Sequence, residues 1–352
     1  LGIIRKNYEN SAAKGRITEA QVEERMNLIE GKTSIEALDS QDMVIEAVFE
    51  NMDLKKDIFK QLDGICKEGA ILASNTSALD VNVIAAETNR PEDVIGLHFF
   101  SPANVMRLLE IVRGEKTSKS VVASSLAIAK KIQKIAAVVG VCPGFVGNRI
   151  LAQRQREANK LILEGALPWD IDDALFDFGF PMGPFAMSDL AGLDIGWNKD
   201  TSNSETLRDV LCEAGRLGQK SGKGFYIYDE NRNKSPDPEV EALIRRFGEE
   251  RQIRMRDDIT KEEILERCLY PMVNEGFKIL EEGMAIRASD IDIVWTNGYG
   301  WPVYEGGPMF YGNIIGFDKI LFWLKKAELE LGPEFKPSAY LEKVVTEEIN
   351  IF

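Results

Sequence analysis

Apolar residues in the first 140 positions of the chain gather in short runs that are separated by longer, more polar stretches. The runs have the length and composition of buried strands, and they cover residues 42–49, 70–74, 94–99, 107–112 and 136–141. The stretches between them are predicted as helices over residues 54–66, 79–88 and 118–135. Strands that alternate with helices at this spacing predict an α/β fold with a largely parallel sheet.

The first 30 residues are predicted as helical, with a break between Asn10 and Gly15. Thr18 is followed three residues later by Gln21, which is the pattern of a capping box. We therefore expect a helix to begin next to Thr18.

The alternating pattern ends near residue 143, and helical stretches dominate from Asn148 onward. In this half, a series of short motifs occurs twice in the same order: Glu-Gly, Asp-Ile-Asp, Gly-aromatic-Pro and Gly-Pro, starting at Glu164 and again at Glu282. We predict an α/β domain over residues 1–143 and two related helical domains over residues 144–250 and 255–352. Two stretches are candidates for the linker between the helical domains: residues 229–238 and residues 251–258. The second stretch is favoured.

Composition and charge narrow the function classes. Hydrophobic residues make up 44% and charged residues 28% of the chain, as in ordinary globular proteins. The net charge of -14 and the lack of a basic patch argue against a nucleic-acid partner, although local cations and helix N-termini can still bind anionic ligands. No apolar run of about 18 residues predicts a membrane span. No secretory signal peptide is recognised, so secretion is not expected.

The four cysteines lie far apart in the sequence and form no CxxC pair. This spacing supports neither a metal site nor a disulfide framework, and it fits a reducing compartment.

His98 is the only histidine, and it stands at the predicted carboxyl end of a strand. Ligands of open α/β sheets bind at that edge, where an imidazole can serve as a general base. Glu110 stands between apolar residues of the next predicted strand, and a buried carboxylate there would need a partner such as His98. The alternative for His98 is a histidine at the end of a strand without a role. The alternative for Glu110 is a solvent-facing glutamate, and this alternative is favoured when Glu110 is considered alone.

Further polar residues follow other predicted strands. Asn75 and Ser77 could bind substrate oxygens, or they could cap the helix that follows. Asn148 could contact a ligand or be an ordinary residue near a helix N-terminus. Three charged residues flank a strand-to-helix turn, where surface charge is the default interpretation: Glu46, Glu50 and Lys55.

Taken together, these segments resemble the 3-hydroxyacyl-CoA dehydrogenase family over nearly the whole chain. The matching motifs are DMVIEAVFENMDLKK (42–56), ASNTSAL (73–79), GLHFFSPANVMRLLEIV (96–112), PGFVGNR (143–149), FPMGPFAMSD (180–189), GQKSGKGFY (218–226), ILEEGMA (279–285) and GYGWP (298–302). The tandem helical repeat is more similar to the multifunctional enzymes of fatty-acid β-oxidation than to the short, stand-alone dehydrogenases.

The resemblance implies a Rossmann-like, NAD-binding first domain and the oxidation of an L-3-hydroxyacyl-CoA with NAD. It implies that His98 is the catalytic base and Glu110 its partner. It also implies substrate contact or positioning of His98 by Ser77 and Asn148, and a place along the cofactor and substrate cleft for Glu50, Lys55 and Asn75. The family occurs in peroxisomes and in the bacterial cytoplasm, so either compartment is expected.

The chain departs from the family pattern in one respect. The glycine-rich GxGxxG turn, which places the pyrophosphate of a dinucleotide at a helix N-terminus, is not found. We expect the N-terminal β-α-β unit to be missing from this chain, and an enoyl-CoA hydratase/isomerase domain to be fused upstream.

Two alternative functions stay open. The first is a non-catalytic or inactive fragment on the same scaffold, which the missing glycine-rich turn favours. The second is a different NAD(P)-dependent dehydrogenase that acts on a sugar or a small hydroxy acid.

Overall fold

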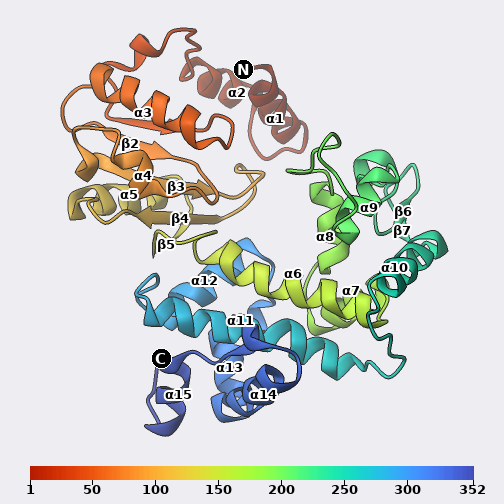
Figure 1. Cartoon of the computed structure of the whole chain (residues 1–352). Helices are drawn as coiled ribbons and strands as arrows, with labels where there is room; N and C mark the ends of the chain where they lie inside the picture. The colour runs from red at the N-terminus through yellow and green to blue at the C-terminus, as the bar shows by residue number, and fades with distance from the viewer.

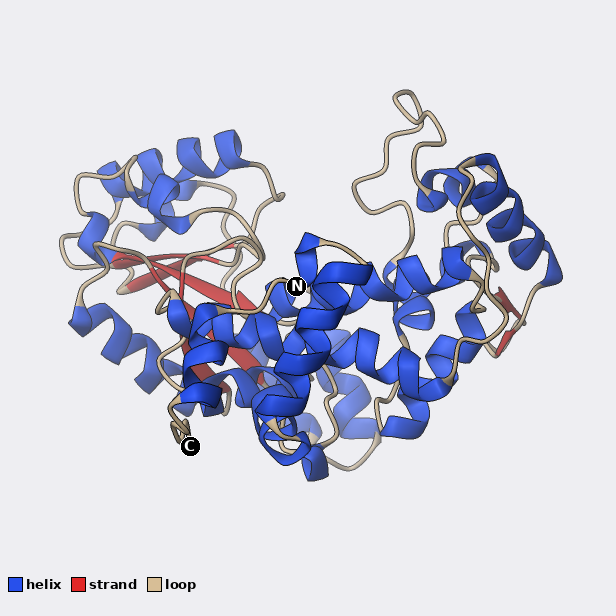
Figure 2. Cartoon of the chain, turned by 60° about the horizontal axis from the view of Figure 1, so that its bottom comes forward, coloured by secondary structure: helices blue, strands red, loops and turns tan.

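The computed structural model describes the whole chain, residues 1–352, and Figure 1 shows a sheet-containing part joined to a larger helical part. The sheet has five strands in the order of the sequence: β1 (Met43–Glu46), β2 (Ile71–Ser74), β3 (Val94–Phe99), β4 (Leu108–Arg113) and β5 (Ile135–Gly140). In Figure 2 the helical part contains only one short strand pair, β6 (Ile227–Tyr228) and β7 (Lys234–Ser235). The structure therefore confirms the prediction of an α/β domain that is followed by a helical part.

The sheet is mixed rather than uniformly parallel. β1, β2 and β3 pair in parallel, and so do β4 and β5, but β3 and β4 are antiparallel. Residues 100–107 alone connect β3 to β4, and this connection is too short for the crossover that a parallel neighbour requires. β1 pairs only with β2, so it forms an edge of the sheet.

The helices of the sheet-containing part lie close to the predicted ranges: α1 (Gly2–Ala13), α2 (Glu19–Asn27), α3 (Met52–Ile65), α4 (Val81–Ala85) and α5 (Lys119–Lys131). The capping box is confirmed, because Thr18 accepts from the Gln21 N–H and the Gln21 side chain accepts from the Thr18 N–H. α5 ends earlier than predicted, at Lys131. Gln133 adopts a left-handed backbone with φ 61°, which a continuing helix does not allow.

The two faces of the sheet pack against different partners, because successive strand residues point to opposite sides. One face packs on α5 and contributes Ile71, Ala73, Ile95, Leu97, Leu109 and Ile111. The other face belongs to the main core, which continues into the helical part, and contributes Val44, Leu72, Val94, Leu108 and Val112. By the same alternation, His98 and Glu110 belong to this second face.

The helical part consists of α6 (Gly147–Glu164), α7 (Pro168–Phe178), α8 (Pro184–Ala191), α9 (Leu207–Glu213), α10 (Pro238–Glu250), α11 (Lys261–Glu281), α12 (Ala288–Gly298), α13 (Pro308–Ile315), α14 (Phe317–Glu330) and α15 (Ala339–Thr346). The long helices α6 and α11 pack against each other in its centre (Figure 1). None of the helices combines the length and the apolar character that crossing a membrane requires.

The internal repeat is visible in how short helices are anchored. Asp172 of α7 accepts hydrogen bonds from the N–H groups of Phe185 and Ala186, in the first turn of α8. Asp292 of α12 accepts from the N–H groups of Met309 and Phe310, in the first turn of α13. A buried carboxylate thus satisfies free helix amides in both series. This supports the predicted repeat, whereas the domain boundaries at residues 143, 250 and 255 stay a prediction.

These buried carboxylates predict how stability depends on pH. Burial raises the pKa of Asp292 to about 7, although the N–H groups of Met309 and Phe310 lower it. Unfolded aspartate titrates near pH 4, so the folded protein binds this proton more tightly, and the resulting stability is lost as the pH rises through 7. Between pH 5.5 and 8 we expect Asp292 to remove about 2 kcal/mol from the free energy of unfolding.

Urea denaturation at both pH values measures this change. Asp292→Asn should show a smaller difference between the two pH values than the wild type, whereas Asp318→Asn, at an exposed position, should not. An unaltered pH dependence in Asp292→Asn would contradict the prediction.

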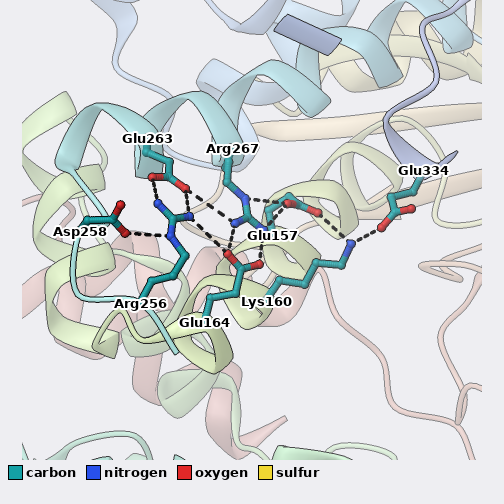
Figure 3. A network of polar contacts seen from close by, with 8 residues as sticks. All are labelled: Glu157, Lys160, Glu164, Arg256, Asp258, Glu263, Arg267 and Glu334. Carbon is teal, nitrogen blue, oxygen red and sulfur yellow. Dashed lines mark hydrogen bonds and ion pairs between the residues drawn. The ribbon is translucent and has the colours of Figure 1, made fainter. Parts of the chain in front are cut away.

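A network of ion pairs, with Arg267 and Glu157 buried at its centre, joins α6 to α11 (Figure 3). Arg267 of α11 donates to Glu157 at 3.1 Å and to Glu164 at 2.9 Å, both on α6. Arg256, in the loop before α11, donates twice to Glu263 at 2.7 and 2.8 Å. The other members are Lys160, Asp258 and Glu334. The network crosses from the first helical repeat to the second.

We expect Arg267→Met to lower the free energy of unfolding by about 3 kcal/mol, because Glu157 is fully buried and would lose its two-pronged partner. Arg245→Met is the matched control. Its partner Glu241 lies one turn away on the same exposed surface of α10, and such a pair contributes about 0.5 kcal/mol or less. Equal unfolding midpoints for the two variants in urea would show that the network adds no stability.

Candidate functional site

His98 and Glu110 form a directly bonded pair. The antiparallel register of β3 and β4 places the two residues opposite each other, and His98 Nδ1 lies 2.8 Å from Glu110 Oε2. The other carboxylate oxygen, Oε1, accepts the N–H of Gly147 at 2.9 Å. Because a carboxylate only accepts, Nδ1 is the donor, and Nε2 of the neutral ring keeps a lone pair. Nε2 has no hydrogen bond within the chain.

The surroundings of the pair are largely apolar. Glu110 is fully buried, so its interpretation as a solvent-facing residue is wrong. The His98 ring lies 4.4 Å from the ring of Phe100 and 5.9 Å from that of Phe145, measured between centroids. Low polarity strengthens the hydrogen bond between imidazole and carboxylate, and the aromatic rings restrict how the imidazole can turn.

The residues after β2 form a tight polar turn around Glu50. Glu50 Oε1 accepts from the Thr76 hydroxyl at 2.6 Å and from the N–H of Ser77 at 2.9 Å. Asn75 Oδ1 accepts the N–H of Phe99 at 2.9 Å and so ties the end of β2 to the end of β3. Neither Asn75 nor Ser77 caps α4, because its N-cap is Asp80. The capping interpretation is therefore wrong for both.

Charged residues at the end of β1 are buried, in contrast to the default expectation. Lys55 is 1% exposed, and its Nζ lies 2.7 Å from Glu46 Oε1 and 3.4 Å from Glu50 Oε2. Surface charge is thus a wrong interpretation for Glu46 and Lys55. Partial burial alone would raise the pKa of Glu50, but the bonds from Thr76 and Ser77 and the charge of Lys55 outweigh it and lower the pKa. Glu50 is held as a carboxylate.

Asn148 connects the two halves of the site. It stands in the first turn of α6, and its Nδ2 donates to the backbone oxygen of Ser77 at 3.3 Å. Its Oδ1 accepts from the hydroxyl of Tyr299 at 2.7 Å. The structure thus brings His98, Glu110, Ser77 and Asn148 into one bonded region.

The contact of Tyr299 with Asn148 was not predicted from the sequence. The residue belongs to the GYGWP motif, which indicated the family but not a place near His98. Nothing in the local sequence shows that residue 299 meets residue 148, since this contact depends on how the helical repeats pack.

The residues predicted to face a cofactor lie along the end of the sheet at which β1 and β2 terminate. Glu50 and Lys55 follow β1 and Asn75 follows β2, at the carboxyl ends of parallel strands where α/β proteins bind nucleotides. The fixed carboxylate of Glu50 can accept hydrogen bonds from sugar hydroxyls. Glu50 therefore fits the sugar side of a dinucleotide, and the buried Lys55 holds its carboxylate in place from behind.

Comparison with known proteins gives matches along both parts of the chain. Residues 1–142 match the model "3-hydroxyacyl-CoA dehydrogenase, NAD binding domain", and residues 144–228 and 264–349 match "3-hydroxyacyl-CoA dehydrogenase, C-terminal domain". The human peroxisomal bifunctional enzyme is 45% identical over 339 residues, which cover 90% of this chain and 47% of that protein. The chain thus spans about half the length of the curated relatives it matches.

Solved structures give the same picture. The dehydrogenase part of multifunctional enzyme 1 from Caenorhabditis elegans is 33% identical with a TM-score of 0.67, covering 96% of this chain and 79% of that one. A 3-hydroxybutyryl-CoA dehydrogenase from Escherichia coli is 25% identical with a TM-score of 0.82, covering 98% of this chain and 90% of that one.

Proposed function

Because the chain belongs to the 3-hydroxyacyl-CoA dehydrogenase family, we propose that it oxidises L-3-hydroxyacyl-CoA to 3-ketoacyl-CoA with NAD in fatty-acid β-oxidation. His98 is the general base of this reaction, and Glu110 is its partner. The observation that carries the proposal is the bond between His98 Nδ1 and Glu110 Oε2, which leaves Nε2 free at the carboxyl end of β3.

His98 takes the proton of the substrate hydroxyl on Nε2, while the C3–H bond breaks and the C3–O bond becomes a carbonyl. NAD, when bound, supplies the acceptor for the hydride that leaves C3. Glu110 stabilises the imidazolium that forms, because its carboxylate already bonds Nδ1 and is itself fixed by the Gly147 N–H. In the reverse reaction, the protonated His98 returns the proton to the ketone oxygen.

The remaining residues hold the reactants. Ser77 and Asn148 contact the substrate oxygen or position His98, and their direct bond keeps the end of β2 next to α6. Glu50 and Asn75 face the cofactor, and the buried Lys55 fixes Glu50 from behind. Each of these assignments is a proposal that rests on the placement of the side chains.

The loss of NADH absorbance on addition of acetoacetyl-CoA tests the proposal. We expect turnover with acetoacetyl-CoA and little with free acetoacetate. Preference for a free keto acid or a sugar would favour the alternative dehydrogenase. No turnover of any of these substrates, whether or not NADH binds, would favour the non-catalytic alternative.

The setting of the reaction is also a proposal, and the names of the relatives support its peroxisomal form. Several are named peroxisomal, and we propose a peroxisome or the bacterial cytoplasm as the compartment of this protein. An upstream enoyl-CoA hydratase/isomerase domain would supply the 3-hydroxyacyl-CoA by hydration of the enoyl-CoA, so that one protein would carry out consecutive steps.

A further inference from the structure

We propose that Tyr299, which belongs to the second helical repeat, is a positioning residue that orients the side-chain amide of Asn148 toward the substrate. This inference rests on the proposed function, because it assigns Asn148 a place beside the reacting oxygen. It extends the active site beyond the first 150 residues to a segment that follows α12.

Two hydrogen bonds fix the orientation of the side-chain amide of Asn148. The Tyr299 hydroxyl lies 2.7 Å from Oδ1, and the Ser77 backbone oxygen lies 3.3 Å from Nδ2. Burial first, and then the charge of Glu110, raise the pKa of Tyr299 well above its usual range, so the phenol keeps its proton. A protonated phenol that donates to Oδ1 holds the amide oxygen toward itself and the NH2 group toward Ser77. One N–H of Asn148 then remains for a substrate oxygen.

The close seating of Tyr299 requires a glycine at position 147. A Cβ atom on Gly147 would lie 2.3 Å from Tyr299 Cε2 and 2.4 Å from its hydroxyl oxygen, closer than any real contact. The same Gly147 donates its N–H to Glu110. The tyrosine therefore packs directly on the backbone that fixes the carboxylate partner of His98.

Aromatic contacts extend from Tyr299 in two directions. On one side its ring stacks on Trp295 of α12, with centroids 4.6 Å apart and planes 25° apart. On the other side its ring meets the edge of Phe100 at 5.3 Å, and Phe100 lies 4.4 Å from the His98 ring. The second repeat thus supports the imidazole through Phe100 as well as the amide through the hydroxyl group.

Tyr299→Phe removes only the hydroxyl and keeps the ring that packs on Gly147. Loss of one hydrogen bond to the half-buried amide of Asn148 should lower kcat for acetoacetyl-CoA reduction roughly 10-fold. The KM for NADH and the shape of the pH profile should not change, because the hydroxyl bonds only Asn148 and the phenol keeps its proton. Tyr304→Phe is the matched control, since Tyr304 is exposed and its hydroxyl meets only the backbone oxygen of Phe178.

A double-mutant cycle tests whether Tyr299 acts through Asn148. In an Asn148→Ala background, Tyr299→Phe should have no further effect on kcat. An equal 10-fold loss in both backgrounds, or the loss of an alkaline limb of the pH profile, would overturn the positioning role. If the wild type turns over and Tyr299→Phe matches it, only this inference fails. A wild type without turnover would instead remove the proposed function on which the inference rests.

Discussion

Replacement of His98 by glutamine is expected to lower kcat for acetoacetyl-CoA reduction by about 10³-fold, since a general acid or base contributes about 10²- to 10⁴-fold. Glutamine can occupy the space between Phe100 and Phe145 and can still donate to Glu110, but its amide cannot carry the proton that the ketone oxygen must receive. His98 is the only histidine of the chain, so no second imidazole can replace it. NADH oxidation at saturating acetoacetyl-CoA measures the effect.

The fold and cofactor binding of His98→Gln should stay intact. Its urea unfolding midpoint and its affinity for NADH, followed by fluorescence, serve as controls. A variant that retains kcat within 10-fold of the wild type would show that another group transfers the proton.

Glu110→Gln is expected to lower kcat by about 10²-fold through the tautomer of His98. The amide oxygen of glutamine can take over the bond from the Gly147 N–H, which places its NH2 group against His98 Nδ1. Nδ1 must then accept, so the ring proton moves to Nε2. A protonated Nε2 cannot remove the substrate hydroxyl proton, and the loss should appear in the oxidation of L-3-hydroxybutyryl-CoA.

Glu115→Gln supplies the matched control, because Glu115 follows β4 on the exposed surface and should leave kcat unchanged. The mechanism assigned to Glu110 fails if Glu110→Gln oxidises the hydroxyacyl substrate as fast as this control does. A lower KM with unchanged kcat would also contradict it, since the carboxylate acts on the imidazolium of the transition state.

Much of the fold follows from local patterns in the sequence. The predicted strand at residues 94–99 matches β3, because a short apolar run that includes β-branched Val94 and Ile95 favours a buried strand over a longer helix. The antiparallel pairing of β3 and β4 was not predicted. The antiparallel direction depends on the short connection after Phe99, and the positions of the strands alone do not predict it.

The site was predicted less completely than the fold. His98 and Glu110 could be proposed from their strand positions and the family resemblance, and the structure places them opposite each other. Lys55 was expected on the surface, because an isolated charge is rarely buried. Only the folded chain shows that Glu46 and Glu50 converge on it and make burial possible.

The bond between Tyr299 and Asn148 joins residues 151 positions apart, and it has a consequence for the order of assembly. During synthesis, the strands that carry His98 and Glu110 leave the ribosome long before α12 does. Long-range contacts form late, because the entropy of closing a large loop opposes them. The dehydrogenase site would then be completed only when the second repeat packs on α6. Recovery of activity during refolding would report this last docking step, after the secondary structure has already returned.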